Sequence, residues 1–227
     1  MSQHLSNAMP ITILDLLSNK IPISRYIKES PILAKSLNLY SHNKNPEVIA
    51  MLDETWLPPD YTIEQLLEMP SDSIGHKLSI HLLAMNRNQE GIHSVPGTAR
   101  FPIRYPISVE KLVGNRLRQT HDYMHLLTNF NTSQLGEAAL QAFYLGQRST
   151  ILSLLYTISS LGSFITKAGQ VDLLEAIING LDMGLNAKPN SSFTRFELCI
   201  TDNLDSIRRS LNIIPTSGTA WTFSEVV

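Results

Sequence analysis

Apolar residues recur three and four positions apart in segment after segment of this chain, and this helical spacing restricts its fold more than any other feature of the sequence. Along 171–185, for example, Leu173, Leu174, Ile177 and Leu181 follow that spacing. The best candidate for an alternating strand, 98–107, contains two prolines, which a strand inside a sheet rarely accommodates. The sequence therefore predicts an all-α fold, a single-domain helical bundle.

Helix-capping residues and prolines set the ends of the expected helices. Asn45 with Pro46, then Thr62, then Ser71 or Ser73 are suited to begin helices. In chain order, we expect helices over about 31–40, 45–55, 63–69, 73–88, 109–129, 133–166 (with or without a bend at Gly146), 171–185 and 193–211. A long irregular arm at 89–107 precedes the helix that starts near 109. A loose N-terminal tail over 1–10, one domain over 11–214 and a C-terminal tail over 215–227 complete the prediction.

Composition limits the classes of function. Charged residues make up 17% of the chain, and the formal net charge is −2. Typical soluble domains contain roughly 25% charged residues. No run of Lys and Arg interleaved with aromatic residues is present, so we expect no nucleic-acid partner. The one cysteine, Cys199, lies in an apolar stretch, which excludes an internal disulfide and a cysteine-ligated zinc site and indicates a reducing compartment.

One stretch approaches the length of a membrane span. Residues 149–166 carry no charge, and eighteen such positions are close to the minimum for a spanning helix. Eight of the eighteen are Ser or Thr, however, so we expect a central helix of a bundle or a helix that lines an apolar cavity. No apolar signal segment begins the chain, and we therefore expect a cytoplasmic protein.

The only cluster of metal-ligand side chains in the sequence begins at 121. His121 and His125 are four residues apart, so on one helix they lie one above the other. Asp122 lies about 100° round the helix from His121. The two imidazoles can therefore share one ion, with a carboxylate nearby.

Glu137 joins this cluster through a turn. Residues 129–133 are rich in turn and cap formers, and Thr132 or Ser133 is suited to begin the next helix. An antiparallel helix pair folded about Asn131 places Glu137 opposite His125, because each is six residues from that point.

Two interpretations of these residues remain open. The two imidazoles and two carboxylates form a mixed nitrogen and oxygen set that suits one divalent metal ion, whether zinc, magnesium, iron or manganese. Alternatively, the histidines are polar ends on a half-buried helix, Asp122 pairs with Arg118, and Glu137 only favours a helix N-terminus.

The spacing His121-Asp122-x-x-His125, with eleven residues before Glu137, resembles the hallmark of the ubiquinone (coenzyme Q) biosynthesis protein 4 family. The resemblance covers roughly 58–215 and includes segments outside the hallmark: 118–120, 135–137, 186–188, 195–197 and 204–213. Phe196 departs mildly from the family, which usually has Trp there. Because no organelle-targeting segment precedes the domain, we expect a bacterial homologue.

The resemblance implies an all-α fold, a divalent cation held by His121, Asp122, His125 and Glu137, and a role in making prenylated quinones. It also implies binding of long isoprenoid lipids, together with either removal of the ring carboxylate at C1 or scaffolding of the enzymes that modify the ring.

We therefore expect a metal-dependent, prenyl-lipid-binding protein of quinone biosynthesis, with the polyprenyl chain in an apolar groove and its polar head at the cation. Helices around 149–166 would wall the groove, and the small residues Gly146, Ser160 and Gly162 would leave room for the chain. Arg118, one turn before the motif, would add a second positive group at the head. The sequence identifies no catalytic residue.

The alternative function is a metal-dependent oxidative decarboxylase or hydroxylase that acts at ring C1 of a prenylated 4-hydroxybenzoate. A phosphohydrolase acting on a prenyl phosphate is disfavoured, since the further His and Asp ligands of such sites are missing. The expected partners are a prenylated lipid or prenyl phosphate and other quinone-biosynthesis enzymes. We also expect a homodimer and peripheral contact with the inner face of a membrane.

Overall fold

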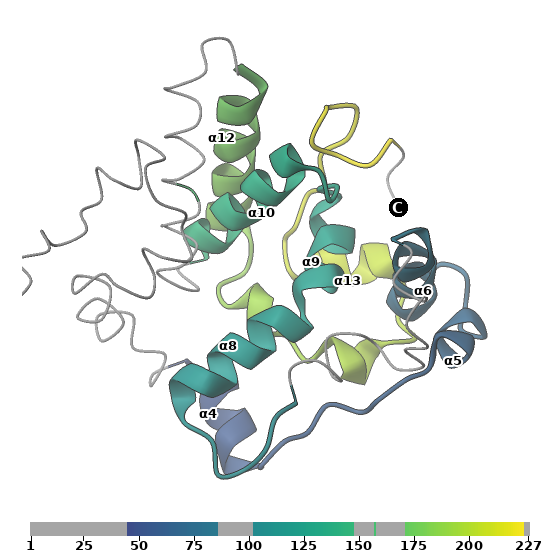
Figure 1. Cartoon of the computed structure of the whole chain (residues 1–227), viewed down its shortest axis with the longest axis vertical. Helices are drawn as coiled ribbons and strands as arrows, with labels where there is room; N and C mark the ends of the chain where they lie inside the picture. Colours follow the sequence, from purple (N-terminus) through teal and green to yellow (C-terminus); the bar gives the residue numbers. More distant parts are fainter. Residues whose placement is uncertain (1–44, 86–101, 148–156, 158–170, 225–227) are drawn as a thin grey trace, which may run out of the picture.

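The computed structural model describes residues 45–85, 102–147, 157 and 171–224 (Figure 1). Regular structure in these residues is helical, with two isolated bridges and no strand. The α-helices are α4 (Pro46–Asp53), α5 (Ile63–Leu67), α6 (Ile74–Ala84), α8 (Val109–Gln119), α9 (His121–Thr128), α10 (Gln134–Gly146), α12 (Val171–Asn186) and α13 (Leu204–Ser210). Two short 3-10 helices, η3 (Ser191–Phe193) and η4 (Phe196–Cys199), precede α13. The predicted all-α class is confirmed.

The predicted cap residues begin four of these helices. The side chain of Asn45 accepts hydrogen bonds from the first-turn N–H groups of α4, and Thr62, Ser73 and Ser133 do the same for α5, α6 and α10. These bonds satisfy N–H groups that have no partner within the helix. The helix predicted over 171–185 is confirmed as α12, whereas the one predicted over 31–40 lies outside the described residues.

The single helix expected over 109–129 is wrong, because the chain bends at Thr120 between α8 and α9. The Thr120 hydroxyl lies 3.0 Å from the carbonyl oxygen of Arg116, four residues earlier, and 3.1 Å from that of Ser192. A hydroxyl that bonds back to the helix backbone favours a bend. The hydrogen bond to the carbonyl of Ser192, 72 residues further along the chain, stabilises this bend. Figure 1 shows α8 and α9 meeting at an angle.

The single helix expected over 193–211 is also wrong, since only η3, η4 and α13 form there. The backbone at 200–202 instead serves the start of α6. The N–H groups of Ile74 and Gly75 donate to the carbonyl oxygens of Asp202 and Ile200, both at 2.9 Å. Asn203 then caps α13, with its side chain accepting from the N–H of Ser206.

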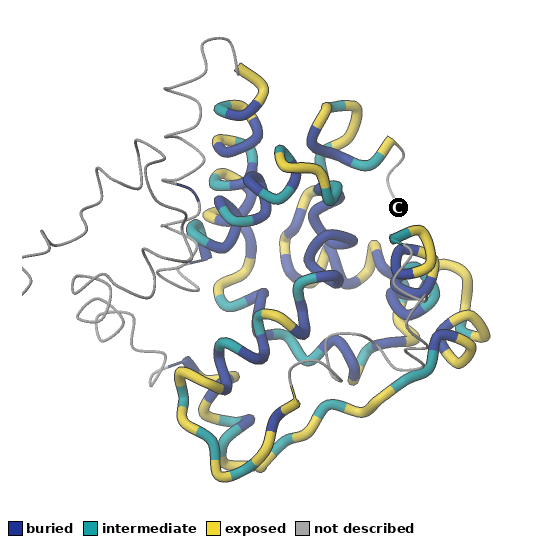
Figure 2. The backbone as a smooth tube through the Cα atoms, in the orientation of Figure 1, coloured by how far each residue is buried: buried dark blue, intermediate teal, exposed yellow. Residues whose placement is uncertain are grey.

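Helix α9 lies at the centre of the main core, and all but its first residue are buried (Figure 2). Helices α6, α10 and α13 contact it. The Arg208 guanidinium of α13 donates to the carbonyl oxygens of Leu126 and Leu127, at 2.6 and 3.1 Å, near the end of α9. Those carbonyls have no partner within the helix, so Arg208 fixes the end of the helix that carries both histidines.

Helices α10 and α12 pack through glycines, which allow the two backbones to approach closely. A Cβ atom at Gly180 or Gly184 would collide with the backbone of Ala139 or Phe143. Gly146, expected to leave room for a lipid chain, instead faces the α12 backbone, where a Cβ would lie 2.8 Å from the Leu181 carbonyl oxygen. The other two small residues proposed for the groove lie outside the described residues, as does nearly all of 149–166.

Two further expectations concern the ends of the molecule and the membrane. Residues 215–224, expected as part of a C-terminal tail, contain no helix and cross the turn between α9 and α10, with the Phe223 N–H donating to the Asn129 carbonyl oxygen at 3.0 Å. In the described part of the chain, no helix has the length and apolar character needed to cross a membrane.

Candidate metal centre

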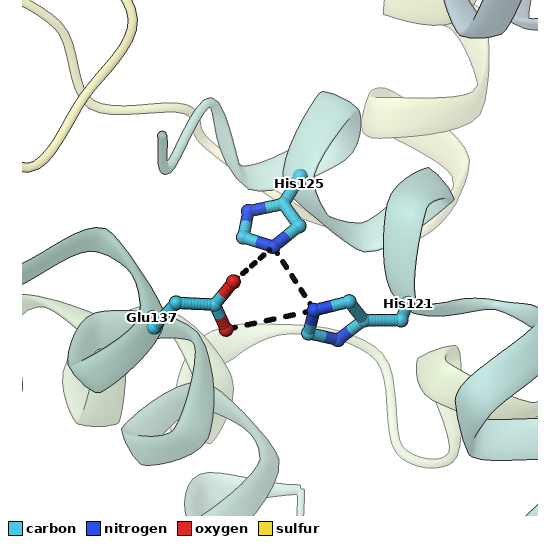
Figure 3. A group of neighbouring side chains, drawn as sticks. All are labelled: His121, His125 and Glu137. Atoms are coloured by element: carbon cyan, nitrogen blue, oxygen red, sulfur yellow. Dashed lines mark hydrogen bonds and ion pairs between the residues drawn. The ribbon is translucent and has the colours of Figure 1, made fainter. Parts of the chain in front are cut away.

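Three side chains from α9 and α10 converge at one point (Figure 3). The Nε2 atoms of His121 and His125 lie 3.2 Å apart. The carboxylate of Glu137 places one oxygen 3.2 Å from His125 Nε2 and the other 3.5 Å from His121 Nε2. The predicted placement of Glu137 opposite His125 is therefore observed.

A tight turn between α9 and α10 sets this pairing. Asn129 ends α9 in the left-handed region, at φ 62°, which Asn tolerates better than most residues. The side chain of Asn131 accepts from the Ser133 N–H at 3.0 Å and donates to the Thr222 carbonyl at 2.8 Å. Gly136, just before the glutamate, has no room for a Cβ because the Asn131 carbonyl oxygen lies against it.

A backbone contact orients His125. Its side chain is fully buried, and Nδ1 lies 2.9 Å from the carbonyl oxygen of Phe130. Because a carbonyl oxygen only accepts, Nδ1 carries a proton, which leaves Nε2 as the atom that a metal ion would bind. A backbone carbonyl on the second nitrogen is the usual arrangement for a metal-binding histidine.

The distances suit one metal ion. Two ligand atoms about 2.1 Å from an ion and roughly 90–110° apart are separated by about 3.0–3.4 Å. The two Nε2 atoms, 3.2 Å apart, lie within this range, and the two oxygens of Glu137 lie 3.2 Å from His125 Nε2 and 3.5 Å from His121 Nε2. One ion could therefore contact both Nε2 atoms and at least one oxygen of Glu137.

The carboxyl group of Glu137, the third candidate ligand, has a lowered pKa. Its partial burial raises the pKa of the carboxyl and is the largest single influence, but hydrogen bonds and charge interactions with His121 and His125 together outweigh it. The net effect lowers the pKa well below the ordinary value for a glutamate. The carboxylate therefore needs no deprotonation before it binds a cation at neutral pH.

Asp122, a predicted metal ligand, is not part of this three-residue group, and Arg118, the remaining predicted site residue, lies on the preceding helix. The buried Asp122 carboxylate faces α6, with Oδ1 3.9 Å from His81 Nε2. Arg118 is exposed on α8, before the bend at Thr120, and one guanidinium nitrogen lies over Gly114, one turn earlier. The roles proposed for both residues stay predictions.

Sequence reasoning missed His81 and Tyr144, which approach the cluster from α6 and α10. The His81 ring stacks on that of His125, with centroids 6.1 Å apart. The burial of His81 could have been predicted from the sequence. His81 follows Ile74 by seven residues and Leu78 by three, so it lies on the same, buried face of α6. Tyr144 follows Glu137 by seven residues, on the same face of α10.

Fold and site together define an all-α protein with a candidate two-histidine, one-carboxylate metal centre in a helical hairpin. Residues 57–217 match the family model for coenzyme Q (ubiquinone) biosynthesis protein Coq4, and the chain belongs to that family. This membership assigns it a role in ubiquinone biosynthesis. The resemblance noted in the sequence is thereby confirmed.

A solved structure shares the fold. The crystal structure of a candidate ubiquinone biosynthesis protein from Nostoc punctiforme superposes with a TM-score of 0.64 at 20% identity, over 88% of this chain and 93% of that one. No curated protein sequence shows significant similarity to the chain.

Proposed function

We propose that the protein holds one divalent metal ion at His121, His125 and Glu137 and binds the polar head of a prenylated quinone precursor there. The observation that carries this proposal is the convergence of the three ligand atoms within 4.8 Å of one another. His125 is completely buried, whereas the side chains of His121 and Glu137 are 29% and 41% exposed. The ion would thus have a closed inner side and an open outer side, on which a head-group oxygen can bind.

The ligand set favours certain metals. Two imidazoles and one carboxylate suit zinc, iron or manganese, while magnesium prefers an all-oxygen environment. When bound, such an ion supplies a Lewis acid that polarises a coordinated oxygen. The chain itself would supply the fixed orientation of His125, through Phe130, and the negative charge of Glu137.

The lipid part of the proposal rests on family membership and on the surface of α12. Val171, Ile178 and Leu185 are seven residues apart and exposed along the length of this helix. An apolar stripe of this kind supports contact with lipid at the membrane surface. Binding of a prenylated lipid or prenyl phosphate, cooperation with other quinone-biosynthesis enzymes and formation of a homodimer belong to the same proposal.

A second candidate function is oxidative decarboxylation or hydroxylation at ring C1 of a prenylated 4-hydroxybenzoate. The observation that favours it is the ligand set, because two histidines and one carboxylate with open positions are typical of non-haem iron oxygenases. Metal-loaded protein incubated with this substrate in air should then release carbon dioxide. Absence of product with iron, manganese and zinc would leave the binding function.

The decisive measurement for the primary proposal is mass spectrometry of the metal and lipid retained on the purified protein. We expect about one divalent ion per chain, together with an isoprenoid lipid. Protein that carries neither, after growth with metals supplied and purification without chelator, would refute the proposal.

A further inference from the structure

Two buried polar atoms beside the metal centre have no hydrogen-bond partner: Nε2 of His81 and the hydroxyl of Tyr144. Both side chains are deeply buried, and the nearby Asp122 is only 7% exposed. Buried polar atoms nearly always bond to protein, water or a ligand, because leaving them unpaired costs free energy. This region of the structure is therefore built around an additional small group.

The distance between His81 and Asp122 indicates the size of that group. Nε2 of His81 lies 3.9 Å from Oδ1 of Asp122, too far for a direct hydrogen bond. One oxygen atom about 2.8 Å from each, with an angle near 90° at that oxygen, would span about 4 Å. The His81 ring is held in place by stacking on His125 and by the edge of Phe223, at 5.6 Å between centroids.

Tyr144 adds a donor to this region. Burial is the main cause that raises the pKa of its phenol, followed by the negative charges of Glu137 and Asp122. The hydroxyl therefore stays protonated, and it is buried without a hydrogen-bond partner. An acceptor at Asp122 and a ring nitrogen at His81, 3.9 Å apart, match a group that both donates and accepts.

We propose that His81 and Asp122 form a hydroxyl-binding subsite beside the metal centre, and that Asp122 serves this subsite instead of ligating the ion. Its ligand is a hydroxyl oxygen, supplied by a water molecule or by the ring hydroxyl of an aromatic head group. The second source rests on the proposed function. The different roles proposed for these α9 residues agree with the directions of their side chains. His121 and His125 face α10, whereas Asp122 faces α6.

Metal affinity tests the role of Asp122. Zinc titrations should give a loss of affinity of at least about tenfold for Glu137→Gln, which removes a ligand, and a clearly smaller loss for Asp122→Asn. Equal losses in the two variants would overturn the assignment of Asp122 to the subsite. A crystal structure of the zinc-loaded protein should show an oxygen bonded to both His81 and Asp122. Direct contact between these two side chains, or Asp122 bound to zinc, would overturn the subsite itself.

Soluble head groups distinguish the two sources of the hydroxyl. If the ring hydroxyl occupies the subsite, zinc-loaded protein should bind 3- or 4-hydroxybenzoate about tenfold more tightly than benzoate, as one added hydrogen bond predicts. His81→Phe should remove that preference and His81→Gln should restore part of it, which separates lost binding from lost folding. Equal binding of all three acids assigns the subsite to water. Binding of none contradicts the proposed head-group function, while the zinc titrations and crystal structure still decide the subsite.

Discussion

Nδ1 of His125 lies 2.9 Å from the carbonyl oxygen of Phe130, just beyond the end of the same helix. This contact points Nε2 of a fully buried imidazole at His121 and Glu137. The turn that places Phe130 there also sets the start of α10, and hence the position of Glu137. The turn thus positions two candidate ligands from two helices, so the candidate metal centre is organised by the chain itself.

Replacing His125 with Ala should reduce bound metal to below about a tenth of the wild-type content, because a three-ligand site loses its most rigid ligand. Elemental analysis of dialysed protein measures this. His76→Ala is the matched control: it lies on α6, its Nδ1 contacts the Leu67 carbonyl at 3.0 Å, and its loss should leave metal content unchanged. Wild-type metal content in the His125 variant would show that the ion binds elsewhere.

A pair of helix glycines gives opposite predictions for stability. Gly180→Ala forces a Cβ into the backbone of Ala139, and overpacking of this kind costs about 1–3 kcal/mol. Gly114→Ala is the control, since its Cβ would meet only the flexible Arg118 guanidinium, 3.9 Å away. Alanine is favoured over glycine inside a helix by about 0.5–1 kcal/mol. Urea unfolding should thus show loss in the first variant and gain in the second. A Gly180 variant as stable as wild type would contradict the close α10–α12 contact.

The parts of the site that local signals determine are predictable from the sequence. The turn residues around Asn131 and the cap at Ser133 fix where α9 ends and α10 begins, and the helical period then brings Glu137 opposite His125. The bend at Thr120 is not predictable in this way, because it depends on the Ser192 carbonyl, 72 residues further along the chain.

The direction of Asp122 escapes sequence reasoning for the same reason. Helical geometry gives its angle relative to His121, but the side chain's neighbour is His81, from a helix whose place against α9 depends on packing of the whole core. The irregular chain at 200–203 is similar, since its backbone leaves helical geometry to bond with Ile74 and Gly75. Contacts between distant segments thus decide what periodicity alone leaves undetermined.

The buried ion pair between Arg116 and Glu197 should be important for stability. Two hydrogen bonds of 2.6 and 2.8 Å join them, both side chains are almost completely inaccessible, and the guanidinium also stacks on Trp56. Glu197→Gln leaves a buried cation without its counter-ion, and breaking such a pair costs about 3–5 kcal/mol.

Thermal or urea unfolding measures that cost. Glu54→Gln is the control, because the Glu54 carboxylate pairs with Arg195 at an exposed position and its loss should change stability much less. Similar effects in the two variants would mean that the Arg116 pair is open to solvent in solution.

Cys199 should react slowly with alkylating reagents in the folded protein. Burial, with smaller contributions from the charges of Asp202 and Glu197, raises the pKa of its thiol to about 11. Only the thiolate reacts, so at pH 8 about one thousandth of the thiol is reactive, against about a quarter for an ordinary cysteine of pKa about 8.5. Mass spectrometry of iodoacetamide-treated protein should show a rate that rises nearly tenfold per pH unit from 8 to 10. The urea-unfolded chain, as control, should react at the ordinary rate. Equal rates for folded and unfolded protein at pH 8 would contradict the partial burial of this thiol against the main core.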